Sequence, residues 1–473
     1  RLTPSAEIST AGTFLPLPND RGWVQGSVIG GGTVTLDARN TGVALDAGSR
    51  VDVSGMQRVL DLAGDGQGAA TTRRSVDAPA GAVTIKSQGG VALQGSLLGQ
   101  RPSATSAGGS FALELVAPEA ATAQRPDLRR IVVSAGLTVA APEAGFVDAP
   151  VASRRLADGG FDKIRLLSDD RIEFRGDNTL DFARGIRLDA PLLDITGNAG
   201  GASSNGSTHV VLQGASVSLG QSLAPLLAVA GVFQRSTLGA SPVLNTRAGS
   251  ASLVVQAGTV DFFGDLTLGG VAQTTVQADN DIRLIGRPVQ AAAAIGGAGL
   301  VTQTGSLSTA GNVTLKAAQV YPTTRTNFAL AVKDTARGTV VPGGFVLVER
   351  SVNRPGDVYS AGASLSVEAD TIVQGGRLKA PMGQIDLKAG RLLELSAGSE
   401  TSVASDGLVH RIIDDLGDEV VERHRRQPDS ARGCRTQAME VLATHVPIEA
   451  AMSSTKQCNV TDESALRSRC APL

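Results

Sequence analysis

Residues 362–398 read GASLSVEADTIVQGG, RLKAPM, GQIDLKAG and RLLELSAG, and our prediction of the fold starts from this stretch. Leu365 and Val367 recur as Ile385 and Leu387, 20 residues later in both cases. Within each unit, apolar and polar residues alternate until Gly, Asp or Ala-Pro ends the run, which is the pattern of a β-strand. A repeat near 20 residues made of such strands predicts a solenoid of β-coils.

Units of the same kind run back along the chain to Gly31. They include GTVTLDA at 32–38, GVALDAG at 42–48 and GNVTLKA at 311–317. We therefore predict an all-β fold in which residues 31–407 form repeated β-coils with loop insertions. Residues 1–30 are predicted to be an irregular lead-in. The stretches 117–130 and 321–360 interrupt the pattern, and we expect them to be insertions that present contact surfaces.

Composition agrees with a narrow solenoid core. Glycine contributes 57 of 473 residues and aromatic residues only 3%. A core built from Val, Leu, Ile and Ala suits coils whose equivalent positions stack on one another. The formal net charge is −2, so no strong field exists to attract nucleic acid, and we expect no nucleic-acid partner.

The chain changes character after Gly407. Residues 408–473 lack the glycine-punctuated alternation, and apolar residues such as Ile412, Ile413, Val420 and Val421 fall at helical spacing between charges. The tail is either a small, partly helical module or an out-of-frame sequence, and its odd number of cysteines favours the second. If the tail does not cover the last coil, the strands from Gln384 to Val403 should be the least stable part of the repeat.

The repeated units of the types GxVTLxA and GVALxAG resemble those of the filamentous haemagglutinin-like exoproteins. These are adhesins that Gram-negative bacteria secrete by the two-partner pathway. The resemblance covers roughly 31–407 and is most typical at 312–318 and 383–398. It implies a right-handed parallel β-helix, export through an outer-membrane pore partner, a secreted or outer-surface location, and attachment to a host receptor or glycan or to other bacteria.

One departure from the family concerns secretion. The family's amino-terminal secretion domain contains Asn-Pro motifs, and this sequence has no Asn-Pro. The resemblance therefore implies an interior or carboxy-terminal portion of such an exoprotein. The sequence shows no charged-then-apolar signal segment at its start.

The sharpest short motif is Arg175-Gly176-Asp177, the tripeptide that integrins recognise in many adhesins. It lies between two strand-like runs, where Arg-Gly-Asp-Asn is also a favourable turn sequence. The turn is the simpler interpretation. A receptor-binding role requires that the turn project from the rod.

The alternative hypothesis is a β-helix enzyme that acts on polysaccharide. Its candidate acidic residues are Asp169-Asp170 and Asp279-Asn280-Asp281. Glycoside hydrolysis needs two carboxyl groups on either side of the scissile bond, whereas adjacent Asp residues in turns usually bind their own backbone. Few aromatic residues are present to form a sugar-binding platform. We therefore expect no enzymatic activity and no catalytic residue.

The sequence also predicts no metal or cofactor site. Cys434, Cys458 and Cys470, with His424 and His445, lack the paired spacing of a zinc site. Gly64-Asp65-Gly66 is a single match to a calcium repeat that works only in series. His209 opens a strand and is expected to be a surface or stacking residue. A third hypothesis, a toxin whose rod carries the tail as its active part, finds no catalytic constellation in the tail.

Overall fold

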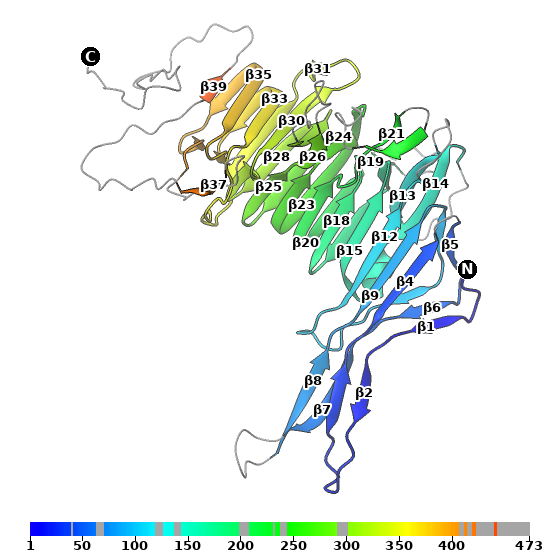
Figure 1. Cartoon of the computed structure of the whole chain (residues 1–473). Helices are drawn as coiled ribbons and strands as arrows, with labels where there is room; N and C mark the ends of the chain where they lie inside the picture. Colours follow the sequence, from blue (N-terminus) through cyan, green and yellow to red (C-terminus); the bar gives the residue numbers. More distant parts are fainter. Residues whose placement is uncertain are drawn as a thin grey trace, which may run out of the picture.

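The computed structural model describes residues 1–38, 41–62, 71–118, 126–136, 143–197, 208–229, 232–236, 244–290 and 301–405, and the strands at 411–413, 419–421 and 439–441. Over these residues the protein is all-β with mostly parallel strands, and it has one short helix, α1 (Ser153–Asp158). That helix is too short and too polar to cross a membrane. Figure 1 shows an elongated stack of strands with a long projection at its N-terminal end.

The parallel pairings follow three series along the stack, which we call series A, B and C. Series A consists of β4 (Thr33–Ala38), β9 (Ala82–Ser87), β12 (Gly109–Leu115), β15 (Phe161–Ser168), β18 (Gly185–Asp189), the second part of β20 (His209–Gly220), the second part of β23 (Arg247–Phe263), β25 (Asp281–Ile285), β29 (Gln319–Pro322), β34 (Arg377–Lys379) and β36 (Glu400–Ser402).

Series B consists of β14 (Phe146–Ala152), β13 (Leu128–Ser134), β16 (Arg171–Arg175), β19 (Leu192–Thr196), the first part of β24 (Asp265–Ala278), the second part of β27 (Val301–Thr309), β30 (Thr326–Asp334), the first part of β33 (Ser364–Gln374) and the first part of β35 (Gln384–Leu395). The short strands β5 (Val43–Leu45) and β10 (Val91–Leu93) pair in parallel, and β10 lies beside β14.

Series C consists of β17 (Asn178–Phe182), the remaining parts of β20, β23 and β24, β28 (Asn312–Ala317), β32 (Phe345–Arg350), and the remaining parts of β33 and β35. A separate parallel sheet joins β1 (Glu7–Ser9), β6 (Arg50–Asp52) and β11 (Ser96–Leu98). Helix α1 contacts both β11 and β17, so it occupies a strand's place between this sheet and series C.

The core is built from equivalent positions that stack from strand to neighbouring strand within each series. In series A, one such column is Val83, Phe111, Ile164, Ile186, Val217, Val260, Ile282, Val320 and Leu378, and every member is buried. Alternation places the intervening residues outside. The three series share one continuous hydrophobic core.

Glycine marks places where one segment of backbone passes close to the next in the stack. A Cβ added at Gly383 would lie 1.8 Å from the carbonyl oxygen of Ala363, the residue 20 positions earlier. No side chain fits at that distance, because real Cβ contacts are never so short. The 20-residue shift seen in the sequence is the register between β33 and β35, since Leu365 pairs with Ile385 and Val367 with Leu387.

Antiparallel hairpins are present in addition to the parallel pairings, and two of them use a strand of series B. They are β2 (Thr13–Pro16) with β3 (Gly26–Ile29), β7 (Met56–Leu62) with β8 (Thr72–Ala78), β21 (Leu226–Val229) with β22 (Val232–Arg235), β26 (Arg287–Gln290) with β27, and β30 with β31 (Thr339–Val340). The first two form the N-terminal projection, which we call the arm (Figure 1).

The prediction that residues 1–30 are irregular is wrong. Strand β1 pairs in parallel with β6, and Leu2 makes a parallel bridge with Leu45, so the first residues pair with strands at the N-terminal end of the stack. Strands β2 and β3 form a hairpin around a turn at Asp20 and Arg21. Strands of three or four residues are too short to show the alternation used for prediction, and pairing with distant strands fixes them.

The insertion predicted at 321–360 belongs largely to the stack. Strand β30 pairs in parallel with β27 and β33, and β32 pairs with β28 and β33. Its runs TNFALAV and FVLV alternate as well as any repeat unit, but the first has no leading glycine to mark its start. Of the insertion predicted at 117–130, residues 128–130 belong to β13 and residues 119–125 lie outside the described residues.

The helical interpretation of the tail is wrong where the tail is described. Strand β37 (Arg411–Ile413) pairs antiparallel with β38 (Glu419–Val421), and β39 (Met439–Val441) pairs in parallel with β35. Ile and Val are β-branched, so they favour extended backbone even where their spacing suits a helix. The remainder of 408–473, with all three cysteines, lies outside the described residues.

Candidate contact sites

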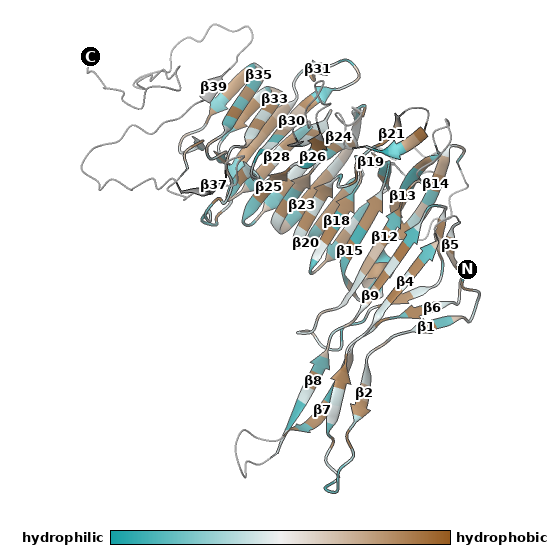
Figure 2. Ribbon diagram, in the orientation of Figure 1, coloured by the Kyte–Doolittle hydropathy of each residue, from teal (hydrophilic) through white to brown (hydrophobic). Residues whose placement is uncertain are grey.

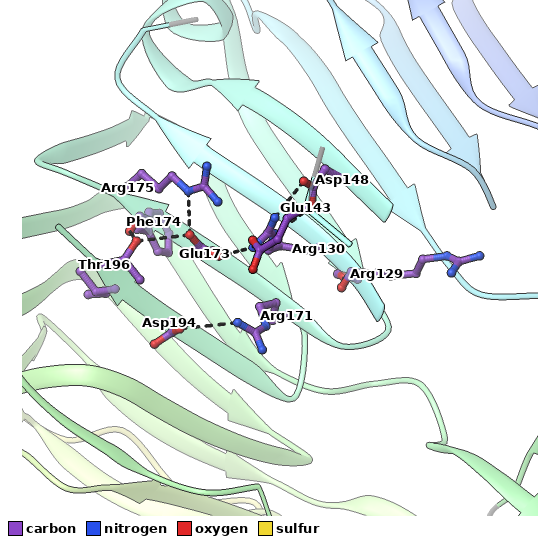
Figure 3. A network of polar contacts seen from close by, with 12 residues as sticks. Arg129, Arg130, Glu143, Asp148, Arg171, Glu173, Phe174, Arg175, Asp194 and Thr196 are labelled. Atoms are coloured by element: carbon purple, nitrogen blue, oxygen red, sulfur yellow. Dashed lines mark hydrogen bonds and ion pairs between the residues drawn. The ribbon is translucent and has the colours of Figure 1, made fainter. Parts of the chain in front are cut away.

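A buried arginine lies at the one point in the described series where stacking order departs from chain order. In series B, β13 lies between β14 and β16, although β14 follows β13 in the chain. Arg130 of β13 has a side chain only 4% exposed. It donates from Nε and Nη2 to the two carboxylate oxygens of Asp148 at 2.8 Å each, and from Nη1 to Glu143 at 2.7 Å (Figure 3).

Arg130 also reaches the next strand of the stack. Its Nη1 lies 3.2 Å from Glu173 on β16, and its guanidinium lies 4.1 Å from the centre of the Phe146 ring. Burial acts to lower the pKa of Arg130, but the hydrogen bonds to Asp148 and Glu143 outweigh it, so the net pKa is raised. This guanidinium therefore stays charged at every ordinary pH and joins three strands.

The cluster continues along the outer side of series B. Glu173 accepts a 2.7 Å bond from Arg175 and a 3.3 Å bond from Thr196. Beyond them, Asp194 accepts a 2.6 Å bond from Arg247 and lies 3.8 Å from Arg171. The ion pairs balance four arginines against four carboxylates. The cluster therefore links neighbouring strands of the stack to one another.

The acidic residues considered for catalysis are engaged with their own chain. Asp169 accepts bonds from the Ala117 amide at 2.5 Å and from Arg235 at 2.8 Å. Asp170 accepts the Arg129 amide at 2.7 Å. At the second candidate, Asp281 accepts the Tyr321 hydroxyl at 3.2 Å, whereas the side chains of Asp279 and Asn280 are exposed. These contacts are those of turn and corner residues.

The tripeptide Arg175-Gly176-Asp177 forms the corner between β16 and β17. Gly176 is buried, has a φ of 66° and donates its amide to Thr196 at 3.0 Å. Arg175 binds Glu173, and Asp177 accepts the His209 amide at 2.8 Å. The turn is thus tied to neighbouring strands, and of its three residues only Asp177 is exposed. His209 opens β20, as the sequence suggested, and its Nδ1 lies 2.7 Å from the Ser252 hydroxyl.

Among the residues that the structure describes, no group of His, Cys, Asp and Glu side chains is arranged to hold a metal ion. Residues 64–66 and the cysteines and histidines of the tail lie outside the described residues.

A shallow cavity of about 250 Å³ lies between α1 and β11, lined by Leu97, Leu98, Val151 and Leu156. Arg155 at its rim already donates to the carbonyls of Leu93, Gln94 and Gly95.

The arm is the most prominent exposed feature, and sequence reasoning missed its strands. Asp61 joins the two hairpins, because it accepts the Val24 amide at 2.8 Å and donates its own amide to the Val24 carbonyl at 2.8 Å. The Arg58 guanidinium lies 5.2 Å from the centre of the Phe14 ring. The signal was present, because TFLP and GSVI flank the turn residues Asn19 and Asp20.

The arm exposes an apolar strip to solvent. Leu15, Leu17 and Ile29 are 54%, 63% and 45% exposed. Leu15 and Leu17 are two residues apart, so their side chains point to the same face of the hairpin, as does that of Thr13. Ile29 pairs with Thr13, so its side chain lies on that face as well. In Figure 2 the tip of the arm between β2 and β3 is hydrophilic. An apolar strip beside a polar tip is typical of a contact surface.

Comparison with known proteins identifies no relative. No family model, curated protein or solved structure matches the chain.

Proposed function

We propose that this chain is a structural shaft, a right-handed parallel β-helix, from a secreted bacterial exoprotein of the filamentous haemagglutinin-like type. It would be an interior or carboxy-terminal portion, exported through an outer-membrane pore partner to the cell surface. Its role would be attachment to host cells or to other bacteria. The observation that carries the proposal is the set of three parallel series with continuous registers over most of the described chain.

A right-handed path is supported by general stereochemistry. Connections between parallel strands of one sheet are right-handed in nearly all proteins, because the twist of the strands favours that hand. Three parallel series that share one core fit a helical path of the backbone with three sides. The glycine-punctuated units that resemble the exoprotein repeats supply these strands, as at 311–317 in β28.

Display is the mechanism that the geometry supports. The stack is stiff, since each coil is hydrogen-bonded to its neighbours and cross-linked by buried ion pairs such as Arg130–Asp148. The arm stands away from this stack and carries the apolar strip Leu15, Leu17 and Ile29. A receptor would contact the arm, and many shafts on one surface would bind together by multivalency.

The first experiment measures attachment. Beads coated with the full chain are added to epithelial cells and to bacteria, and bound beads are counted. We expect the triple variant Leu15→Ser, Leu17→Ser, Ile29→Ser to bind several-fold less, because apolar contact area is lost. Val352→Ser is the matched control, since Val352 is 99% exposed but lies outside the arm. Equal binding by the triple variant would reject the arm as the contact site.

Two further measurements separate the hypotheses. Asp177→Glu should leave bead binding unchanged, because the tripeptide is engaged as a corner; a loss of binding would restore its receptor role. Release of reducing sugars from acidic polysaccharides, abolished by Asp169→Asn with Asp170→Asn, would replace the adhesin proposal with the enzyme hypothesis. Retained sugar release in that variant would exclude these two residues.

A further inference from the structure

A short segment at the start of β23, residues 244–247, connects two strands of series B that are not neighbours, and we call it the strap. At one end of the strap, Arg247 pairs in parallel with Gly269 of β24. One residue earlier, Thr246 is hydrogen-bonded to the hairpin of β30 and β31. In series B, β27 lies between β24 and β30. The strap therefore reaches from β24 to the second strand beyond it.

Two half-buried threonines, 89 residues apart, form the contact between the strap and the hairpin. The Thr246 hydroxyl donates to the Lys333 carbonyl at 2.8 Å and accepts the Thr335 amide at 3.1 Å. The Thr335 hydroxyl donates to the Leu244 carbonyl at 2.8 Å and accepts the Thr246 amide at 2.7 Å. Each hydroxyl thus acts as both donor and acceptor, which a side chain without a hydroxyl cannot do.

The strap adds a contact of a different kind from the parallel pairing of the stack. Pairing joins each strand to its immediate neighbours, as β27 is joined to β24 and to β30. A stack held only by such contacts opens strand by strand from an end. The strap instead closes a ring of contacts, because it joins β30 back to β24. Strand β30 can leave β27 only if the contact between the two threonines breaks as well.

We propose that the contact between Thr246 and Thr335 is a clasp that makes β24, β27 and β30 open as one cooperative unit. Opening that begins at exposed Leu395 passes through β35 and β33 and stops at β30, where the clasp must break. The clasp thereby protects the middle of the stack when the C-terminal end opens. This proposal concerns only how the stack opens, so it does not depend on the adhesive function.

Hydrogen exchange of the full chain at increasing urea concentrations tests the clasp. In the natural sequence, amides of β27, of β30 and of the part of β24 that pairs with β27 should exchange through one common opening, later than those of β33. The double variant Thr246→Val, Thr335→Val keeps the shape of both side chains and removes both hydroxyls. Its β30 amides should exchange at least about tenfold faster than those of β24, because four hydrogen bonds are lost.

Matched variants separate the clasp from a general effect of substitution. Thr246→Ser with Thr335→Ser keeps both hydroxyls and should exchange like the natural chain. Thr275→Val makes the valine change on a half-buried threonine of β24 outside the clasp and should not affect β30. Either single valine variant should separate β30 from β24 in part, since each hydroxyl makes two of the four bonds.

Three results would overturn the proposal. The first is a natural chain in which β30 opens before β24. The second is valine variants in which β30 and β24 still open together, which would make the contact a local one. The third is a serine double variant that exchanges like the valine double variant, because the hydroxyls would then not be the cause.

Discussion

At the scale of single residues, the buried charges carry structure. Arg130 has lost almost all contact with water, and its cost of desolvation is offset by Asp148, Glu143 and Glu173 together. It lies where β14 packs on the opposite side of β13 from β16. A charge that binds both neighbouring strands therefore favours this stacking order over one that follows the chain.

Removal of the Arg130 side chain should be severe. Arg130→Ala leaves Glu173, whose side chain is 6% exposed, without its partner on β13, and we expect a loss of about 3–5 kcal/mol in the free energy of unfolding. Urea unfolding followed by circular dichroism measures it. Arg247→Ala is the control, because that side chain is 53% exposed and should cost less than about 1 kcal/mol. Equal losses of unfolding free energy in the two variants would show that the burial of Arg130 is not the reason for its contribution to stability.

Tyr321 offers a pH-dependent test. Burial, with the neighbouring Asp281 carboxylate, raises the pKa of its phenol from 10.0 to about 12. A raised pKa means that the folded state prefers the neutral phenol, so this contribution to stability is complete below pH 10 and is lost as the pH rises towards 12. Tyr321 and Tyr359 are the two tyrosines of the chain.

Absorbance of the phenolate in a Tyr359→Phe variant reports Tyr321 alone. We expect a midpoint near pH 12 while the protein stays folded, and a lower midpoint after Asp281→Asn. A midpoint near pH 10 with circular dichroism unchanged would contradict the burial of this hydroxyl.

The sequence predicted some residue roles and missed others for physical reasons. A turn at Arg175-Gly176-Asp177 followed from local preference, since glycine accepts positive φ. The partners of Asp169 could not be predicted from local sequence, because Arg235 lies 66 residues away in the chain. Arg130 was invisible for the same reason. Nothing local distinguishes an arginine that will be covered by two distant strands from one in a solvated loop.

At the scale of elements, the arm should be separable from the stack. Leu60 is buried, yet it lies outside the continuous core, and Phe14 packs beneath Arg58 within the arm. Replacement of residues 14–28 and 57–77 by short Gly-Ser turns should change the free energy of unfolding of the stack by less than about 1 kcal/mol. Leu113→Ala within the stack should cost about 2–5 kcal/mol. Loss of cooperative unfolding in the arm deletion would contradict this separation.

Strand positions were predictable where glycine introduced an alternating run within a recognised repeat unit. β4, β5, β28 and β35 begin within one residue of the predicted strands, because the pattern and the turn that precedes it coincide in sequence. β30 was assigned to an insertion because no glycine precedes it, and β32, although it follows Gly343 and Gly344, was assigned with it as part of the same long stretch. In the tail, helical spacing led to the prediction of a helix where the described residues form strands. Helical spacing in a short apolar run is weaker evidence than the presence of β-branched residues.

At the scale of the whole molecule, the two ends of the stack differ. Residues 1–12 pair with the first strands of the stack through β1 and the Leu2–Leu45 bridge. At the other end, in β35, Leu395 occupies the position of buried Val348 and Gln374, yet it is 46% exposed. Protection should therefore rise from β36 and β35 towards the middle of the stack.

Native-state hydrogen exchange tests this gradient. Amides of β36 and of Leu392–Leu395 in β35 should exchange through local opening well before those of β15 and β18, whose two sides are both paired. Uniform protection across the stack would show that the chain unfolds as one unit and would remove the end effect. This measurement also bears on the sequence-based expectation that 384–403 is the least stable stretch.

The register of 20 residues between Leu365 and Ile385 also has a mechanical meaning. A chain held at both ends and stretched would detach its paired segments one after another, beginning where Leu395 is exposed. Each detached segment of 20 residues would add about 70 Å of extended backbone. Such a molecule yields in many small steps under tension and dissipates a pull that would otherwise break its outermost contact.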